Sequence, residues 1–584
     1  MKVIRLLWPW VKPYRRFAVV AVLGALVSVG INLAIPLQTA RVIDDGIIAE
    51  DRGLVIRTVV IMIVLILAGM AVSAFSSAMA VRMAFNTITD LRRDLYSHTQ
   101  RLSYANLDRL SSGELLTRLT SDMTKLLAVL TMGVSFLAQT PVMFIGAMVA
   151  IIALDASLSI VIAGMVPFIA VVVWYMLTRS EALYDAVQSR LDRLNNVLSE
   201  NIAGTEAIKA FVRQDHEVER FDRVADDLAD RSIVVNQLVA SLMPTLIGIS
   251  SVAIAAVLWF GGNNVIDGRL TTGNLVAFIS YLAMVALPMM IFAFIQPMLS
   301  AAGASMRRID EVLSEEPAVP SADSGIDLGD QDEPGDVRFV GVSFRYSRGN
   351  TSLDGVDNVL TGIDLHIRQG RTVAILGATG SGKSTLVNLI PRFYDATEGT
   401  VLVGGVDVRN LTKRSLRRSV AVALQEPQLF RGSVTDNLRY GRSDATEEEL
   451  VAAAVAAQAD GFIRDMPEGY ESIIEQGGSN LSGGQRQRIA IARTLVVDPV
   501  ILVLDDSTSA VDLDTESRIQ EALATRGDRT VVIVAQRIST ALGADEIVVL
   551  DEGRVMAHGT HEELLATSET YQEIFRSQLG ERVR

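Results

Sequence analysis

The first half of the chain contains six apolar stretches, each about as long as the ~20 residues that an α-helix needs to cross the core of a lipid bilayer. Each carries few or no charges, and so many such stretches rarely occur together in one soluble fold. We expect spanning helices at residues 17–37, 58–81, 132–154, 158–177, 238–261 and 275–299. The predicted fold of this half is an all-α polytopic membrane domain, and the lipid bilayer is its first predicted partner.

The distribution of Lys and Arg predicts the orientation of these helices, because basic residues accumulate on the cytoplasmic side. The N-terminal segment is basic, and the long segments 82–131 and 178–237 are rich in Arg. In contrast, the connection 155–157 has no basic residue and 262–274 has only Arg269. We therefore expect both termini, and any soluble domain attached to them, in the cytoplasm of a bacterial cell, with the chain in the inner (plasma) membrane. The two long segments should be cytoplasmic extensions of the spanning helices.

Composition excludes several classes of function. The chain has no cysteine, so disulfides, cysteine-ligated metals and cysteine nucleophiles are ruled out. Its 53 Lys and Arg against 67 Asp and Glu give a net charge of -14, which argues against a nucleic-acid partner, since such proteins need a basic footprint. Residues 314–336 are acidic and rich in Pro and Gly. They predict a linker between a membrane domain over 1–313 and a soluble α/β domain over 337–584.

The soluble domain contains a complete P-loop, in which an apolar strand at 373–376 precedes Gly-Ala-Thr-Gly-Ser-Gly-Lys-Ser-Thr. Glycines let the backbone turn tightly so that its N–H groups surround a phosphate. Lys383 places a positive charge between the β- and γ-phosphates, and Ser384 offers a hydroxyl to Mg²⁺. The predicted nucleotide-binding residues of the loop are Gly377, Gly380, Ser381, Gly382, Lys383, Ser384 and Thr385.

Other motifs indicate which P-loop family this is. About a hundred residues after the loop, Leu-Ser-Gly-Gly-Gln at 481–485 opens a basic helix. Further landmarks are Gln425, the strand Val500–Leu504 that ends in Asp505, and the sequence Ser-Ala-Val-Asp at 509–512. The soluble domain therefore resembles the nucleotide-binding domain of ABC ATPases. With six spans and two long cytoplasmic segments, almost the whole chain resembles one half of an ABC exporter.

This resemblance implies roles for individual residues. Tyr346 would stack on the adenine of ATP, and Gln425 would join Ser384 as a ligand of Mg²⁺. Asp505 would hold the metal through water. The signature residues Ser482, Gly483, Gly484 and Gln485 would face the γ-phosphate of a nucleotide that a second ABC half-transporter binds. One chain would thus supply two half-sites, and a partner chain is required.

Two positions depart from the family pattern, and both are close to the bond that is cleaved. Family members normally have Glu after the metal-binding Asp, where this chain has Asp506, and a His at the position of Gln536. Because Asp is one methylene shorter than Glu, its carboxylate lies further from the attacking water. A misplacement of about 1 Å can cost about 10²-fold in rate. Glutamine can donate a hydrogen bond but cannot carry the proton or charge of histidine. We therefore expect these two catalytic positions to form a degenerate site.

Together these features predict a subunit of a heterodimeric ABC exporter that moves a lipophilic or amphipathic solute, and that alone hydrolyses ATP weakly. Its signature would serve the catalytic site of the partner. Three alternatives stay open: a homodimeric exporter with a weakened carboxylate, an importer on the exporter fold, and an ATP-gated regulatory membrane subunit. Short helices around 105–112 and 204–212 are expected to dock on the nucleotide-binding domain of the same chain and of the partner, respectively.

Overall fold

The computed structural model describes residues 2–320, 325–346, 358–524 and 528–579, which form two compact units. Unit 1 comprises Met1–Gln100 and Gly113–Ser314, and unit 2 comprises Arg101–Ser112 and Glu315–Arg584. The short segment 101–112, which belongs by sequence to the membrane half, thus lies in the second unit.

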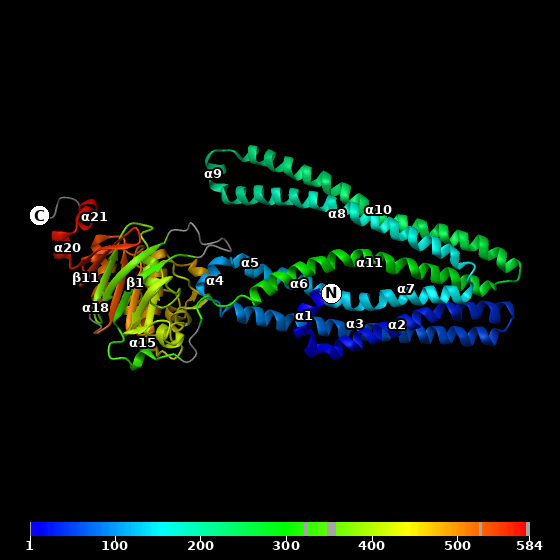
Figure 1. The fold of residues 1–584 in the computed structure, drawn as a ribbon, viewed down its shortest axis with the longest axis horizontal. Coiled ribbons are helices and arrows are strands. Elements are labelled where there is room, and N and C mark those ends of the chain that lie inside the picture. The colour runs from blue at the N-terminus through cyan, green and yellow to red at the C-terminus, as the bar shows by residue number, and fades with distance from the viewer. Residues whose placement is uncertain (1, 321–324, 347–357, 525–527, 580–584) are drawn as a thin grey trace. The chain divides into compact units, whose positions relative to one another are not determined.

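The described residues of unit 1 are helical and include no strand. Its α-helices are α1 (Lys2–Val11), α2 (Arg15–Arg41), α3 (Arg52–Thr99), α5 (Ser112–Thr117), α6 (Met123–Ala128), α7 (Val134–Leu154), α8 (Ser159–Ala203), α9 (Thr205–Ala210), α10 (Gln214–Ile266) and α11 (Thr272–Leu313) (Figure 1). Three π-helical segments, η2 (Val42–Ile48), η3 (Arg118–Asp122) and η4 (Val129–Gly133), continue these helices. Such wide turns are rare and widen the helix locally.

Five helical stretches of the described chain are long and apolar enough to cross a membrane: Arg5–Ile48, Arg52–Thr99, Ser112–Leu154, Ser159–Ala203 and Gln214–Ile266. They have 43 to 53 residues. At a rise of about 1.5 Å per residue they measure about 65 to 80 Å, more than twice the ~30 Å thickness of the bilayer core. Four of the first five predicted spans lie inside one of them, and the other, 158–177, begins one residue before Ser159–Ala203. The sixth predicted span lies in α11, whose described apolar segment Thr272–Val285 is shorter.

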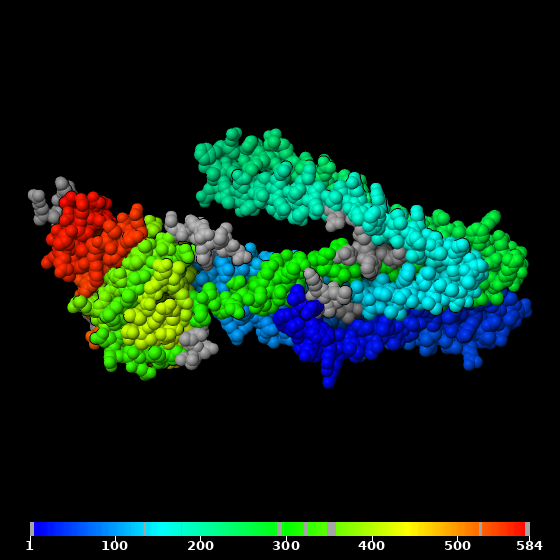
Figure 2. Space-filling model, in the orientation of Figure 1, coloured from blue at the N-terminus to red at the C-terminus, as the bar shows by residue number. Residues whose placement is uncertain are grey.

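Within unit 1, helices α2, α3, α7 and α11 pack against one another, whereas α8 and α10 pair along their length. The core that joins α7, α8, α10 and α11 includes the fully buried Phe278 and Tyr281. Toward α9 the α8–α10 hairpin stands apart from the other helices of the unit (Figure 2). At this end Phe211 and Val212 are 78% and 79% exposed. The hairpin therefore presents apolar side chains that its own unit does not cover.

The described residues of unit 2 form three β-sheets. A four-stranded antiparallel sheet has the order β2-β1-β4-β5, a six-stranded sheet has the order β12-β11-β3-β10-β9-β6, and β7 pairs with β8. The strands are β1 (Val337–Phe344), β2 (Leu360–Ile367), β3 (Thr372–Leu376), β4 (Glu398–Val403), β5 (Val406–Asp407), β6 (Val420–Ala423), β7 (Gly432–Ser433), β8 (Ile473–Ile474), β9 (Ile501–Asp505), β10 (Thr530–Ala535), β11 (Glu546–Asp551) and β12 (Arg554–Gly559). In the larger sheet all neighbours pair in parallel except β11 and β12.

The helices of unit 2 connect these strands and surround the larger sheet. They are α4 (Tyr104–Arg109), α12 (Lys383–Asn388), α13 (Lys413–Ser419), α14 (Val434–Arg439), α15 (Glu447–Ala456), α16 (Asp460–Arg464), α17 (Gly483–Val496), α18 (Leu513–Ala524), α19 (Ile538–Ala541), α20 (His561–Thr567) and α21 (Glu569–Leu579).

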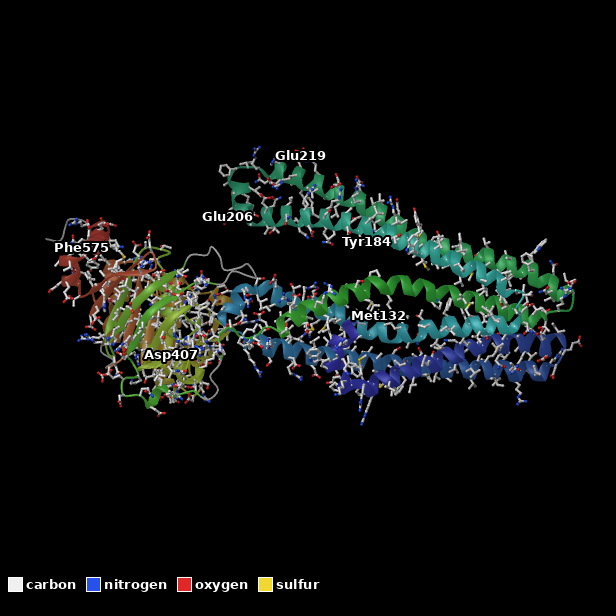
Figure 3. All side chains as sticks on the ribbon, in the orientation of Figure 1. Met132, Tyr184, Glu206, Glu219, Asp407 and Phe575 are labelled. Carbon is white, nitrogen blue, oxygen red and sulfur yellow. The ribbon has the colours of Figure 1, made fainter. Side chains whose placement is uncertain are left out.

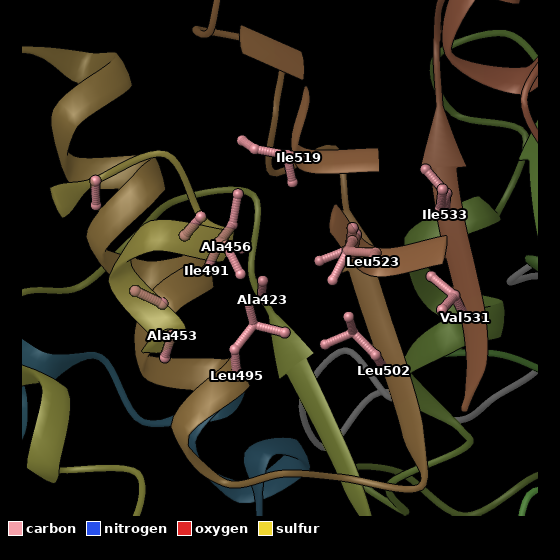
Figure 4. Packing of buried hydrophobic residues seen from close by; sticks show 14 of the residues in the cluster. Ala423, Ala453, Ala456, Ile491, Leu495, Leu502, Ile519, Leu523, Val531 and Ile533 are labelled. Carbon is pink, nitrogen blue, oxygen red and sulfur yellow. The ribbon is translucent and has the colours of Figure 1, made fainter. Parts of the chain in front are cut away.

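Strand β9 shows why the central strands are apolar throughout. Side chains alternate between the two faces of a strand. Ile501 and Val503 belong to the core shared with the antiparallel sheet, whereas Leu502 and Leu504 belong to the core on the other face, which α15, α17 and α18 cover (Figure 4). Because both faces are buried, the strand needs an uninterrupted apolar sequence, as is typical of parallel sheets.

Helix α4 is docked on unit 2 through a buried asparagine. Asn106 is fully buried, and its Nδ2 donates to Glu315 Oε1 (2.8 Å) and to the carbonyl oxygen of Glu316 (2.9 Å). Its Oδ1 accepts from the backbone N–H of Ala318 at 2.9 Å. At the other side of α4 the Tyr394 hydroxyl donates to Asp108 Oδ2 at 2.7 Å. A short helix expected around 105–112 is therefore present as α4, and it packs within unit 2.

Part of the segment expected as a linker packs on unit 2. Leu328 is fully buried in the core below the antiparallel sheet, and Ile326 forms a β-bridge with Leu411. Asp327 Oδ1 accepts from the Ser415 hydroxyl at 2.6 Å. These contacts fix the chain before β1.

Candidate nucleotide-binding site

The P-loop connects the C-terminal end of β3 to α12, and two of its glycines are required by the packing. A Cβ at Gly377 would lie 2.1 Å from the carbonyl oxygen of Leu550. Gly382 has a φ of +98°, and a Cβ there would lie 2.8 Å from Leu360 Cδ2. No side chain fits at either position, so the backbone of the loop lies directly against its neighbours. Gly380 also has a positive φ, of +87°.

Lys383 lies in the centre of the loop and is only 6% exposed. Its Nζ donates to the carbonyl oxygens of Gly377 (2.8 Å) and Ala378 (2.7 Å). Burial lowers the pKa of Lys383, while the carboxylates of Asp506 and Asp505 oppose that shift. A buried ammonium that only carbonyl oxygens contact is poised to pair with an anion.

The Ser381 hydroxyl gives a second sign that the loop fits a phosphate. Ser381 is 4% exposed, and its Oγ has no hydrogen-bond partner among the described residues. Buried polar atoms are normally paired, so an unpaired one at the loop suits a ligand oxygen. Thr385, one turn into α12, has its Oγ1 3.1 Å from the Tyr346 hydroxyl.

The predicted metal ligands Ser384 and Asp505 meet at the edge of the sheet. Asp505 is the last residue of β9, is 4% exposed, and its Oδ1 accepts from Ser384 Oγ at 2.8 Å. Burial raises the pKa of Asp505, and the hydrogen bond from Ser384 opposes the rise. A hydroxyl and a carboxylate are hard oxygen donors of the kind that Mg²⁺ prefers.

Asp506 accepts hydrogen bonds from the two glutamines, Gln425 and Gln536, that sequence analysis identified. Gln536 Nε2 donates to Asp506 Oδ2 at 2.9 Å, and Gln425 Nε2 donates to the same oxygen at 3.3 Å. Burial raises the pKa of Asp506, whereas Lys383 and Arg537 oppose the rise. The backbone φ of Asp506 is +48°, a left-handed conformation in which Asp occurs more often than most residues. The positions that depart from the family pattern therefore form one contact group beside the P-loop.

Tyr346 lies at the end of the described part of the chain after β1. Its ring meets those of Phe344 and Tyr394 edge-on, at centroid distances of 4.9 and 5.4 Å. Burial raises the pKa of the Tyr346 hydroxyl, and the hydrogen bond with Thr385 opposes this. Tyr346 thus connects the P-loop helix with Tyr394, which holds α4.

The signature residues form the start of α17. Ser482 and Gln485 make a reciprocal capping box, in which Ser482 N–H donates to Gln485 Oε1 at 2.9 Å and Gln485 N–H donates to Ser482 Oγ at 3.3 Å. A Cβ at Gly484 would lie 2.9 Å from the carbonyl oxygen of Ala510, and one at Gly483 would lie 3.5 Å from Ala510 Cβ. The helix therefore begins in contact with the loop that follows Asp506, and its N–H groups give it a partial positive charge.

Sequence reasoning did not single out three polar residues that tie these loops together. Gln487 of α17 donates to Ser509 Oγ (3.2 Å) and accepts from the N–H of Ala510 (3.0 Å). Glu516 accepts hydrogen bonds from Thr508 and Thr540, which follow Asp506 and Gln536 in the sequence. Gln578 donates to the carbonyl oxygen of Gln536. The local sequence offers little signal for such residues, because each acts through a segment that is distant along the chain.

Comparison with known proteins agrees with this architecture. Residues 18–289 match the ABC transporter transmembrane region, and residues 360–509 match the ABC transporter model. The uncharacterized ABC transporter ATP-binding protein YfiB of Bacillus subtilis is 35% identical over 98% of both chains. An uncharacterized ABC transporter ATP-binding protein of Mycobacterium tuberculosis is 34% identical, also over 98% of both. A bacterial Atm1-family ABC exporter, solved with ATP bound, aligns with a TM-score of 0.80 at 25% identity over 96% of this chain and 99% of that chain.

A unit of long apolar helices joined to a P-loop α/β unit defines a membrane transport ATPase. The matches along the whole chain identify its family: the protein belongs to the ABC transporters, as an exporter half-transporter with an N-terminal membrane domain and a C-terminal ATP-binding domain. Members of this family hydrolyse ATP to drive transport and function as dimers. The predicted fold class, an all-α membrane domain fused to an α/β P-loop domain, is confirmed.

Proposed function

We propose that this chain is the degenerate-site half of a heterodimeric exporter, in which its own P-loop mainly retains ATP and the partner's site hydrolyses it. The observation that carries the proposal is the contact group of Asp506 and Gln536, in which Gln536 Nε2 lies 2.9 Å from Asp506 Oδ2. The carboxylate is short and accepts hydrogen bonds from two amides, one of which stands where the family has histidine. Neither amide can take up a proton from the attacking water.

Glu516, a buried carboxylate close to Asp506, is not free to replace the missing glutamate. Glu516 influences the pKa of Asp506, but its side chain is 5% exposed and is already engaged. Its Oε1 accepts from Thr508 Oγ1 at 2.9 Å and from Thr540 Oγ1 at 2.7 Å. A buried carboxylate that bridges two threonines has a structural task and no access to a nucleotide-bound water.

The same loops support ATP and Mg²⁺ binding in this chain. Ser384, Gln425 and Asp505 supply oxygen donors, and the pair Ser384–Asp505 is already within hydrogen-bonding distance, which fits a hard divalent cation. Tyr346 would stack on the adenine while its hydroxyl contacts Thr385. The signature at Ser482–Gln485 would face the nucleotide of the partner, because in ABC dimers each ATP lies between the P-loop of one chain and the signature of the other.

The second docking helix would contact the partner. Helix α9 lies at the free end of the α8–α10 hairpin, the end at which Glu206 and Glu219 also lie (Figure 3). Phe211 and Val212, which stand between these two glutamates in the sequence, are exposed. Unit 2 has a complementary groove of about 960 Å³. Its lining includes the exposed ring of Tyr440 and five basic side chains, Lys413, Arg414, Arg417, Arg418 and Arg442. We assign the hairpin end of each subunit to this groove of the other.

The name of one relative supports a proposal for the cargo and the location. One relative of 33% identity over 99% of this chain, from Bacillus subtilis, is named "Putative multidrug export ATP-binding/permease protein YgaD". We infer a lipophilic or amphipathic solute and the plasma membrane of a bacterium, with both termini and the ATP-binding domain in the cytoplasm. The basic segments between the apolar stretches support this orientation.

The proposal is tested by purifying the chain alone and with its co-expressed genomic neighbours, in mild detergent. The chain alone should bind Mg·ATP and turn it over slowly. Mass spectrometry of the material that co-purifies should reveal a second ABC half-transporter that has the glutamate and histidine. Fast steady-state hydrolysis by the partner-free chain would contradict the degenerate site and would indicate a homodimeric exporter.

A further inference from the structure

The loop that carries Gln536 is held by the last described helix of the chain. Helix α21 (Glu569–Leu579) contributes Gln578, whose Nε2 donates to the carbonyl oxygen of Gln536 at 2.9 Å. The Oε1 of the same side chain accepts from the N–H of Ile538 at 2.7 Å. One amide therefore clamps the backbone on both sides of Arg537.

The second of these bonds replaces a missing helix cap. Ile538 is the first residue of α19, whose N-cap residue Arg537 makes no side-chain capping bond. The first N–H groups of a helix have no partner within the helix and need one from outside. Gln578 supplies that partner from a different helix, so α21 determines where α19 begins and hence where β10 ends in Gln536.

The position of Gln578 follows from the sequence of α21. Tyr571, Ile574, Phe575 and Gln578 are spaced by three and four residues, so they share one face of the helix. Tyr571 is fully buried, and its hydroxyl lies 2.7 Å from His561 Nδ1. Ile574 and Phe575 pack against the same apolar core. The buried side chains anchor the helix, and Gln578 extends this face to the nucleotide side of the sheet.

A cavity connects the same helix with the P-loop. It has a volume of about 370 Å³, and its lining includes Gly377–Thr379, Gln536, Ile574 and Gln578. On this side the loop of Gln536 therefore borders a cavity. The two hydrogen bonds from Gln578 hold the backbone of this loop in place beside the P-loop. The amide of Gln536 in turn reaches Asp506.

We propose that Gln578 is a positioning residue for the γ-phosphate side of this site, and that α21 thereby forms part of the nucleotide-sensing machinery. The proposal rests on the proposed function, in which Gln536 stands at the histidine position of the family and its amide would face the γ-phosphate of bound ATP. It predicts that the loss of Gln578 impairs recognition of the triphosphate but leaves recognition of the diphosphate intact, because a nucleoside diphosphate does not reach Gln536.

The test compares the binding of Mg·AMP-PNP and Mg·ADP to the full-length chain in lipid nanodiscs. Gln578→Ala should weaken AMP-PNP binding about three- to tenfold, the effect of one misplaced hydrogen bond, and should leave ADP binding unchanged. Gln572→Ala is the matched control, since this glutamine lies on the same helix and its Nε2 donates to the carbonyl oxygen of Leu565 at 2.9 Å. The control should change neither affinity.

A second variant and a double-mutant cycle complete the test. Gln578→Glu keeps the acceptor for Ile538 N–H and loses the donor to Gln536, so it should shift the ratio of the two affinities in the same direction. Gln536→Ala combined with Gln578→Ala should weaken AMP-PNP binding no more than Gln536→Ala alone, because both act through one contact.

Equal losses of affinity for AMP-PNP and ADP, no loss for either, or additive effects of the two substitutions would overturn the proposal. Fast ATP turnover by the isolated chain would contradict the degenerate site but would not change this comparison, because AMP-PNP is not hydrolysed.

Discussion

At the scale of single residues, the site combines an intact cradle for phosphate with altered chemistry next to it. Gly377 and Gly382 stand where packing allows no side chain, and Lys383 and Ser381 present buried polar atoms to the loop. Asp506 and Gln536, in contrast, contact each other. Under the proposed function, such a site would bind ATP but lack a base for the attacking water, and would therefore retain ATP.

Restoring the family residues should therefore restore chemistry. The double variant Asp506→Glu/Gln536→His should raise the ATP turnover of this chain's site, because it extends the carboxylate and returns a group that can carry a proton. A rise of about 10-fold or more in single-turnover hydrolysis by the complex is expected, provided that the partner's signature is intact. Lys383→Ala in the same background is the control and should abolish the gain. An unchanged rate would show that these two positions do not limit hydrolysis.

At the scale of elements, a single buried side chain holds α4 within unit 2. Asn106 is buried and makes three hydrogen bonds to the residues that follow α11. Asn106→Ala should lower the free energy of unfolding of the ATPase unit by about 1–3 kcal/mol, since it leaves a buried carbonyl and N–H unpaired. Denaturant or thermal unfolding of the full-length protein measures this.

The variant Asn106→Asp tests the hydrogen bonds that this side chain donates separately from the one that it accepts. The carboxylate keeps the acceptor for Ala318 N–H but cannot donate to Glu315, and it adds a like charge beside that residue. It should be at least as destabilising as the alanine variant at neutral pH. Equal stability of Asn106→Asp and the unsubstituted chain would mean that α4 is not held by these bonds.

The second docking helix gives a prediction about coupling. Ala207 lies in α9, between the acidic Glu206 and the exposed end of the hairpin. Ala207→Asp should place a charge in the apolar contact with the partner and reduce transport per ATP hydrolysed, while nucleotide affinity changes by less than about twofold. Transport into vesicles and ATPase activity are measured on the same preparation. If the ratio of transport to hydrolysis is preserved, α9 is not the contact that we assign.

Sequence patterns predicted the elements that local residues specify. The apolar stretches identified the long helices, and the P-loop and signature identified the ATPase. These motifs are contiguous in the sequence, and the requirement for each residue type arises within the motif itself. The contacts of Asn106, Glu516 and Gln578 could not be predicted in this way. Each bonds to a segment between 8 and more than 200 positions away, and the tertiary fold brings the partners together. The π-helical turns in unit 1 were likewise not predicted from the sequence.

At the scale of the whole molecule, the chain is an ABC exporter subunit, and the proposed function gives its two ATP half-sites unequal roles in a dimer. Its P-loop would pair with the partner's signature and form the weak site. Its own signature, in which Ser482 caps α17, would pair with the partner's P-loop and complete the hydrolysing site. Substitutions in this one chain should therefore affect the complex very unequally.

The most direct test of this account is the steady-state ATPase activity of the purified complex with Ser482→Arg or with Asp506→Asn in this chain. Ser482→Arg puts bulk against the γ-phosphate in the hydrolysing site and should stop most turnover. Asp506→Asn acts only in the weak site and should reduce activity by less than about twofold, whereas the loss of a true general base typically costs about 10²–10⁴-fold. If Asp506→Asn is as damaging as Ser482→Arg, Asp506 is a working catalytic carboxylate and the account of a degenerate half-site is wrong.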